Sequence, residues 1–183
     1  MTDEQLIAAF RGGDDSAFEK LIKRHESRVA ATVIGMLGNC PEAEDVGQEV
    51  FIRFYRGIDK FRGESSVGTY LTRIAINLSL NELKKRKRRS MLFSQKSNGN
   101  PSDIPAEGAD NPYDADKEII RRVVQTLHPD FRSVIVLRLM DGYSTKETAE
   151  ILGIPEGTVL SRLARAQMKL KKILSPYFGG SDG

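Results

Sequence analysis

Apolar residues recur at intervals of three and four along most of this chain, which is the spacing of amphipathic helices. A short first helix is expected to begin at the capping box Thr2–Gln5 and to stop at Gly12. Asp14 or Asp15 then caps a long helix that Gly38 ends. The stripe of this long helix comprises Phe18, Leu21, Ile22, His25, Val29, Val33, Met36 and Leu37.

A third helix is predicted from Pro41, because proline fits the first turn of a helix. One face of this helix is apolar and is expected to be buried. The opposite face mixes acidic and amide groups with one isoleucine, and carries Asp45, Gln48, Glu49, Ile52 and Arg56. That composition suits a small protein-docking surface, but a solvated face with one stray isoleucine is equally common. The residues alone leave both interpretations open.

The next segment, residues 61–89, combines a polar loop, a helix and a basic run. Glycine and paired serines make the loop a turn with a helix cap, at Arg62, Gly63, Glu64, Ser65 and Ser66. The helix that follows leaves Arg73, Asn77, Asn81 and Lys84 off its apolar face. Six consecutive cations then repel one another, so a polyanionic partner such as nucleic acid is favoured over a solvated tail. They are Lys84, Lys85, Arg86, Lys87, Arg88 and Arg89.

The periodicity disappears between residues 91 and 115. Pro101, Pro105 and Pro112 exclude a long helix there, and the polar and acidic composition is that of a flexible linker. The chain is therefore predicted to be all-α, with two small helical domains at residues 1–90 and 116–177 joined by this linker.

The second domain shows the pattern of a helix-turn-helix. A capping box at Ser144–Glu147 starts a short helix, Gly153 forms a tight turn, and a last helix runs from about Glu156 to Leu174. The outward face of that helix is basic near its start, which is where base edges are read, so we expect it to bind DNA. The residues on this face are Thr158, Leu160, Ser161, Arg162, Arg165 and Lys169.

Composition, charge and cysteine content restrict the class of protein further. The chain of 183 residues is 39% hydrophobic and 29% charged, as ordinary globular proteins are. No apolar run is long enough to span a bilayer and the N-terminus is not a signal peptide, so we expect a cytoplasmic protein without membrane insertion. A net charge of only +3 with clustered cations is typical of a nucleic-acid footprint. The single Cys40, with only His25 and His128 to assist it, predicts neither a disulfide nor a metal site.

Two blocks of the sequence resemble the extracytoplasmic-function (ECF) sigma factors, a group of small proteins within the sigma-70 class. The first block runs from Ala43 to Phe51 and continues through Phe61-Arg62-Gly63 to Arg73–Asn77, and it is similar to region 2. The second runs from Leu127 through Gly153–Val159 to Ala166, and it is similar to region 4. Both blocks occur in the family's order, so the resemblance is more specific than a helix-turn-helix alone.

The resemblance implies a role for each surface. Asp45, Gln48, Glu49 and Ile52 would dock on the clamp helices of the polymerase beta-prime subunit, which decides the question that the isoleucine left open. The loop 62–66 would hold a flipped base of the −10 element. Arg73, Asn77 and Asn81 would lie near the separated strand and the basic run near the upstream backbone. The last helix would enter the −35 major groove, and its domain would also meet the polymerase beta flap.

Three residues depart from the family pattern. Tyr70 stands where a tryptophan is frequent, and Leu160 where a basic residue is frequent, so that the −35 contact there would be apolar. Gly47 replaces a larger residue inside the docking helix, at a cost of about 1 kcal/mol in helix preference.

The resemblance also implies partners and excludes others. We expect core RNA polymerase, promoter DNA and an anti-sigma factor that covers the polymerase-docking surfaces. The sequence shows no nucleophile–base pair, metal cluster or phosphate-binding glycine loop, so neither catalysis nor a cofactor is expected. A stand-alone helix-turn-helix regulator is the main alternative but would leave the first domain unexplained. A nuclease or recombinase would need an acidic metal site or a nucleophile.

Overall fold

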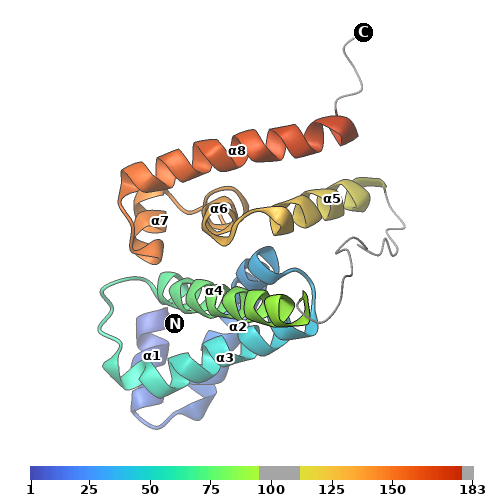
Figure 1. Ribbon diagram of the computed structural model, residues 1–183. Helices are drawn as coiled ribbons and strands as arrows, with labels where there is room; N and C mark the ends of the chain where they lie inside the picture. Colours follow the sequence, from blue (N-terminus) through green and yellow to red (C-terminus); the bar gives the residue numbers. More distant parts are fainter. Residues whose placement is uncertain (95–111, 179–183) are drawn as a thin grey trace.

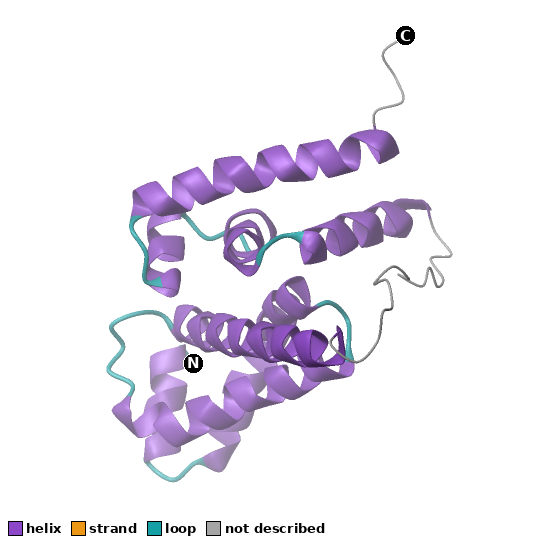
Figure 2. Ribbon diagram, viewed as in Figure 1, coloured by secondary structure: helices purple, strands orange, loops and turns teal. Residues whose placement is uncertain are grey.

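The computed structural model describes residues 1–94 and 112–178 of the chain, and these residues are helical with no strand (Figure 2). The first half (residues 1–94) contains α1 (Asp3–Arg11), α2 (Asp15–Leu37), α3 (Pro41–Gly57), the 3-10 turn η1 (Ile58–Lys60) and α4 (Val67–Ser94). The second half (residues 112–178) contains α5 (Pro112–Thr126), α6 (Pro129–Ile135), the π-helical segment η2 (Val136–Met140), α7 (Thr145–Leu152) and α8 (Glu156–Phe178). The predicted all-α class is confirmed.

The helix ends follow the local signals in the sequence. Thr2 and Gln5 form the expected capping box of α1, Asp14 caps α2 through the backbone N–H of Ser16, and Gly38 ends α2 with a φ of 82°. Two ends differ from the prediction, because α4 continues to Ser94 and α5 already begins at Pro112. Proline is compatible with a first helical turn, and the lysines and arginines at the end of α4 are good helix formers. The central part of the predicted linker, residues 95–111, lies outside the described residues.

The core of the first half is formed where α2, α3 and α4 pack together. Phe54 on α3 is fully buried and contacts the rings of Phe18, Phe61 and Tyr70, with centroids 5.9, 6.1 and 5.9 Å away. Tyr70 therefore packs in this cluster as an aromatic residue should. His25 also has a structural role, since its Nε2 atom lies 2.8 Å from the carboxylate of Asp3 and ties α2 to α1.

Helix α4 lies on the side of the first half that faces the second half (Figure 1). It packs against α2 and α3 on one side and against α6 and α7 on the other. Residues on most faces of the middle of α4 are therefore buried. They include the polar Thr69, Thr72 and Ser79. The second half has a small core of its own, built around Val134, Ala149 and Val159.

No helix within residues 1–94 or 112–178 is long and apolar enough to cross a membrane.

Candidate protein-docking and nucleic-acid interfaces

The mixed face of α3 remains uncovered although α3 itself is packed into the first half. Asp45 and Gln48 are exposed, and Ile52 keeps 43% of its surface accessible to solvent. Glu49 is half-buried and accepts a hydrogen bond of 2.9 Å from Arg53 Nε, one turn along the helix. The four predicted docking residues thus lie on one helix with their side chains on or near the surface.

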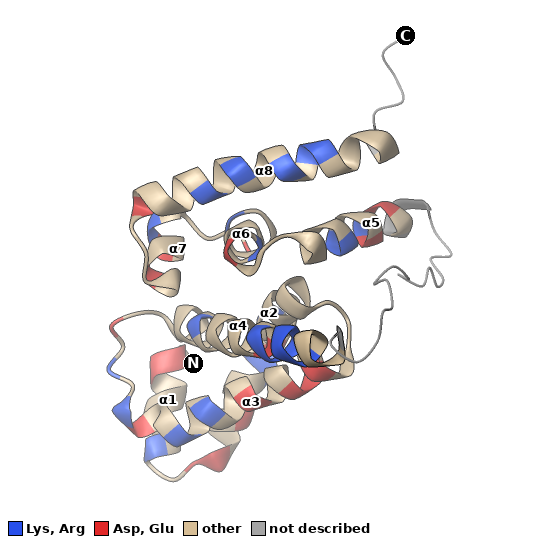
Figure 3. Cartoon of the chain, viewed as in Figure 1, with Lys and Arg blue, Asp and Glu red and all other residues tan. Residues whose placement is uncertain are grey.

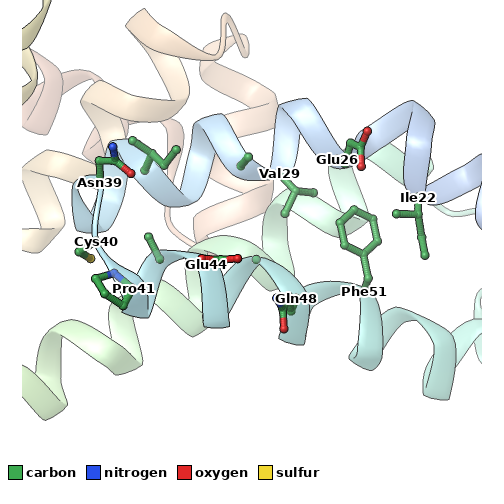
Figure 4. Close-up of a pocket in the computed structure, with 13 residues that line it drawn as sticks. Ile22, Glu26, Val29, Asn39, Cys40, Pro41, Glu44, Gln48 and Phe51 are labelled. Carbon is green, nitrogen blue, oxygen red and sulfur yellow. The ribbon is translucent and has the colours of Figure 1, made fainter.

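A groove of about 750 Å³ runs between α2 and α3 and adjoins this face. Figure 4 shows Phe51 pointing from α3 toward α2, where Ile22 and Val29 lie. Gln48 lines the groove and also belongs to the docking face, so the two features are continuous. The groove could not be predicted from the sequence, because it depends on how two helices pack and not on either helix alone.

Gly47 lines the same groove, and it has no steric reason to be a glycine. A Cβ atom built at this position would have nothing within 4 Å. Glycine inside a helix costs about 1 kcal/mol relative to alanine, and its missing side chain leaves this part of the groove open.

The loop after η1 forms a second hollow, of about 300 Å³, against the start of α4. Arg11 fixes the entry to the loop, since its Nη2 donates to the carbonyl oxygens of Ile58 at 2.5 Å and Phe61 at 2.7 Å. Ser66 fixes the exit, because its Oγ accepts a hydrogen bond of 3.1 Å from the backbone N–H of Thr69. The hollow is lined by Lys60, Phe61, Arg62, Glu64, Ser65, Tyr70 and Arg73.

The walls of this hollow are suited to a planar polar ligand. Phe61 and Tyr70 meet edge to face at 5.1 Å between ring centroids. Arg73 extends into the lining from α4, and its Nε is a buried atom without a hydrogen-bond partner in the described part of the protein. Arg73 therefore brings a cationic side chain to the hollow, while its Nε itself is enclosed by the protein. Of the predicted −10 residues, Arg62, Glu64, Ser65 and Arg73 meet here, whereas Gly63, Ser66, Asn77 and Asn81 do not line it.

The basic run divides into bound and unbound cations. Figure 3 shows the Lys and Arg positions gathered toward the C-terminal end of α4. Arg86 is turned inward, where it donates to the Leu37 carbonyl oxygen at 3.0 Å and to Cys40 Sγ at 2.9 Å. Glu82 pairs with Arg89 at 2.9 Å and lies 4.0 Å from Lys85. DNA contact by Arg86 stays a prediction, but the Arg86 side chain already joins α4 to the segment between α2 and α3.

The cations without a protein partner are a smaller set. Within the described residues, Lys84, Lys87 and Arg88 make no ion pair and are exposed. They are therefore the members of the run best able to meet a phosphate backbone.

The helix-turn-helix forms as the sequence predicted. Ser144 and Glu147 make the capping box of α7, and the Ser144 backbone N–H, 2.8 Å from the carboxylate, lowers the pKa of Glu147. Gly153 ends α7 in the left-handed conformation, with a φ of 66°, and α8 follows three residues later. Helix α8 extends past the predicted Leu174 to Phe178.

The outward residues of α8 differ in how freely they can reach a ligand. Leu160, Ser161 and Arg165 are exposed. Arg162 is half-buried with its Nη2 atom 3.4 Å from Asp130, and the Lys169 ammonium lies 4.8 Å from the centre of the Phe131 ring. Thr158 is half-buried, and its carbonyl oxygen accepts a hydrogen bond from Ser161 Oγ. Arg165 therefore has the least constrained cationic group near the start of the helix.

No group of three His, Cys, Asp or Glu side chains in the described ranges is arranged to hold a metal ion.

Known proteins match both halves of the chain. Residues 21–89 match Sigma-70 region 2, and residues 117–170 match Sigma-70, region 4. The RNA polymerase sigma-H factor of Pseudomonas aeruginosa is 32% identical over 95% of this chain and 94% of its own length. The ECF RNA polymerase sigma-E factor of Escherichia coli K12 is 34% identical over 96% of each chain.

Solved structures agree on the fold. The sigma factor RpoE in complex with the anti-sigma factor NepR from Bartonella quintana has a TM-score of 0.68 at 23% identity, covering 86% of this chain and 96% of that chain. CnrH in complex with the cytosolic domain of CnrY has a TM-score of 0.70 at 22% identity, covering 95% and 97%. With both sigma-70 regions present in order and relatives above 30% identity along nearly the whole length, the chain belongs to the sigma-70 family as a sigma factor of the ECF type.

Proposed function

We propose that this sigma factor uses three separate surfaces, one for core RNA polymerase and two for the promoter. The α3 face with its groove docks on core RNA polymerase, the hollow at loop 62–66 receives a flipped base of the −10 element, and α8 reads the −35 duplex. The observation that carries the proposal is a hollow with aromatic walls, Phe61 and Tyr70, that the cationic side chains of Arg62 and Arg73 also line. An extruded base offers such a hollow both a flat surface and acceptor atoms.

Strand opening needs no catalytic group on this chain. Unpairing and unstacking cost a few kcal/mol at each flipped base. A protein that binds the open strand better than the duplex shifts the equilibrium by the difference between the two affinities. The polymerase makes the phosphodiester bonds, and the sigma factor acts as a binding protein in the cytoplasm.

An anti-sigma factor is proposed as a further partner that covers the docking face. Support comes from the exposure of Gln48 and Ile52 beside an open groove. A sigma factor of the same fold, RpoE, has been solved in complex with the anti-sigma factor NepR from Bartonella quintana.

Transcription from a supercoiled library of random promoters tests the proposed function. Core RNA polymerase without its own sigma subunit is combined with the protein, and the transcripts are sequenced. Initiation at a shared pair of −35 and −10 sequences is expected. Random start sites, or none above those of core polymerase alone, would refute the proposal and favour a stand-alone regulator.

The two kinds of DNA contact should respond differently to mutation. Arg165→Ala is expected to cost about 1–3 kcal/mol of binding to the selected promoter and to relax preference at one −35 position, as loss of a bidentate base contact does. Replacing Lys84, Lys87 and Arg88 with alanine should weaken binding to all sequences alike. The slope of the logarithm of the binding constant against the logarithm of the salt concentration should also become shallower, by about 0.9 for each phosphate contact that is lost.

Holoenzyme binding to promoter variants across a salt series measures both effects. Lys171→Ala, an exposed cation elsewhere on α8, and Lys20→Ala, an exposed cation on α2, are the matched controls. An equal loss of sequence preference from Arg165→Ala and from the triple variant would contradict this division of roles.

A further inference from the structure

Helix α8 turns one face away from the rest of the protein. Figure 1 shows α8 on the side of the second half that points away from the first half. Between residues 157 and 165 the exposed positions recur at intervals of three and four, so they share one face of the helix. They are Gly157, Leu160, Ser161, Ala164 and Arg165. The proposed function places this outward face in the major groove of the −35 duplex.

Two further cations of α8 are drawn toward α6. The Nη2 atom of Arg162 lies 3.4 Å from the carboxylate of Asp130, and the ammonium of Lys169 lies 4.8 Å from the centre of the Phe131 ring. Asp130 and Phe131 both belong to α6. The exposed Asp130 carboxylate would also repel the acceptor groups of DNA placed beside Arg162. Base reading therefore falls mainly to the outward face.

Two side chains of the outward face can distinguish one base from another. Gly157 has no side chain, and the Ser161 hydroxyl, which donates to the Thr158 carbonyl oxygen at 3.1 Å, is of a kind that pairs with several bases. Arg165 carries an exposed guanidinium, which matches O6 and N7 of guanine. Leu160 offers only methyl groups, and 54% of its surface is exposed. Leu160 and Arg165 therefore carry most of the discrimination.

The four bases differ in what they would present to Leu160. In the major groove thymine presents a C5-methyl group, whereas adenine and cytosine present amino groups and guanine presents two acceptors. A polar group covered by leucine loses water without gaining a hydrogen bond. A methyl group covered by leucine is buried against an apolar surface, which is worth a gain of about fourfold in affinity. Leu160 therefore favours thymine over the other three bases.

The packing of α8 gives no structural reason for a leucine at position 160. The adjacent Val159 is fully buried and forms the small core with Val134 and Ala149, so the opposite side of the helix meets the protein. Single exposed leucines are common on protein surfaces. Leu160 differs from these because it lies in the first turns of the second helix of a helix-turn-helix, where base edges are contacted.

We propose that Leu160 is a specificity-determining residue that reads the C5-methyl group of one thymine in the −35 element. This inference rests on the proposed function, because it requires α8 to lie in the major groove. Leu160 and Arg165 are separated by about 7.5 Å along the helix axis, which corresponds to about two base-pair steps. The thymine is therefore expected within about two base pairs of the position at which Arg165→Ala relaxes the preference.

Deoxyuridine tests the contact, because it differs from thymine only in lacking the C5-methyl group. The full-length protein with core RNA polymerase is bound to the selected promoter, and each thymine on either strand of the −35 element is replaced in turn. At one of these thymines the affinity of the wild type is expected to fall about fourfold. The same replacement should leave the affinity of Leu160→Ala unchanged. Ile173→Ala, which removes an exposed apolar side chain near the far end of α8, should respond like the wild type.

Leu160→Arg distinguishes a change of specificity from a general loss of binding. Arginine pairs with guanine, so in a library randomised over the −35 element this variant should select guanine, on either strand, where the wild type selects thymine. Continued selection of thymine there by Leu160→Arg would contradict the proposal.

Two negative results have different meanings. If no deoxyuridine weakens wild-type binding more than it weakens binding of Leu160→Ala, the thymine contact is wrong and the proposed function stands. If the wild-type holoenzyme shows no preference at −35 at all, the proposed function is wrong and this inference falls with it.

Discussion

Replacing Gln48 and Ile52 together with lysine is expected to weaken binding to core RNA polymerase at least about 100-fold. Both side chains are exposed on α3 and Gln48 also lines the groove beside Phe51. Docking removes water from this surface, so two new ammonium groups would lose their hydration without finding partners. Competition between labelled and unlabelled sigma factor for core polymerase measures the loss.

A matched pair controls for added charge. Ser27 and Ala31 are exposed on α2 with the same four-residue spacing, and neither lines the groove. Their double lysine variant should bind core polymerase like the wild type. The Gln48 and Ile52 variant should still bind a −35 duplex, because α8 is unchanged. Wild-type affinity for core polymerase in that variant would mean that the docking face has been assigned to the wrong side of α3.

Arg132→Met is expected to lower the free energy of unfolding by about 1–3 kcal/mol for each buried acceptor that loses its donor. The Arg132 side chain is buried and donates to the carbonyl oxygens of Met36 at 2.7 Å and Leu127 at 3.0 Å, and to Gln125 Oε1 at 3.2 Å. Burial lowers its pKa to about 10, so it keeps its charge at neutral pH. Methionine would fill much of the space but would leave these acceptors buried without donors.

Urea denaturation of the variant and the wild type measures this loss. Arg121→Met, at an exposed position on α5, should change stability by no more than about 0.5 kcal/mol. Arg132→Lys should not restore the wild-type value, because one ammonium cannot reproduce the planar fork of a guanidinium. A loss below about 1 kcal/mol for Arg132→Met would show that water replaces the arginine.

Local signals made much of the fold predictable from the sequence. A cap lies within a few residues of the N–H or C=O groups that it satisfies, so Thr2, Asp14, Gly38 and the Ser144–Glu147 box marked helix ends correctly. The helix-turn-helix could be predicted for the same reason. The ends of the linker were harder, because Pro112 can either break a helix or begin one, and here it begins α5.

Contacts between distant polar residues could not be predicted. Arg86 looked like one cation in a DNA-binding run, yet its partners, Leu37 and Cys40, are almost 50 residues away. Thr72 lies on α4 with no local sign that Tyr143 will cover it. Apolar periodicity shows which face of a helix packs into the nearest core. It does not show that a second face of α4, which carries hydroxyl side chains, is buried as well. The hollow and the groove depend on such packing, and so their full lining was missed.

The polar second face of α4 has a consequence for synthesis on the ribosome. About 60 residues separate the end of α4 from the end of α7, which covers it. A ribosome adds that length in about 3–12 s. During this interval Thr72 and Ser79 can be hydrated, which lowers the cost of leaving this side of α4 uncovered. The docking face on α3 is then presented to the cell before the segment that closes over α4 has been made.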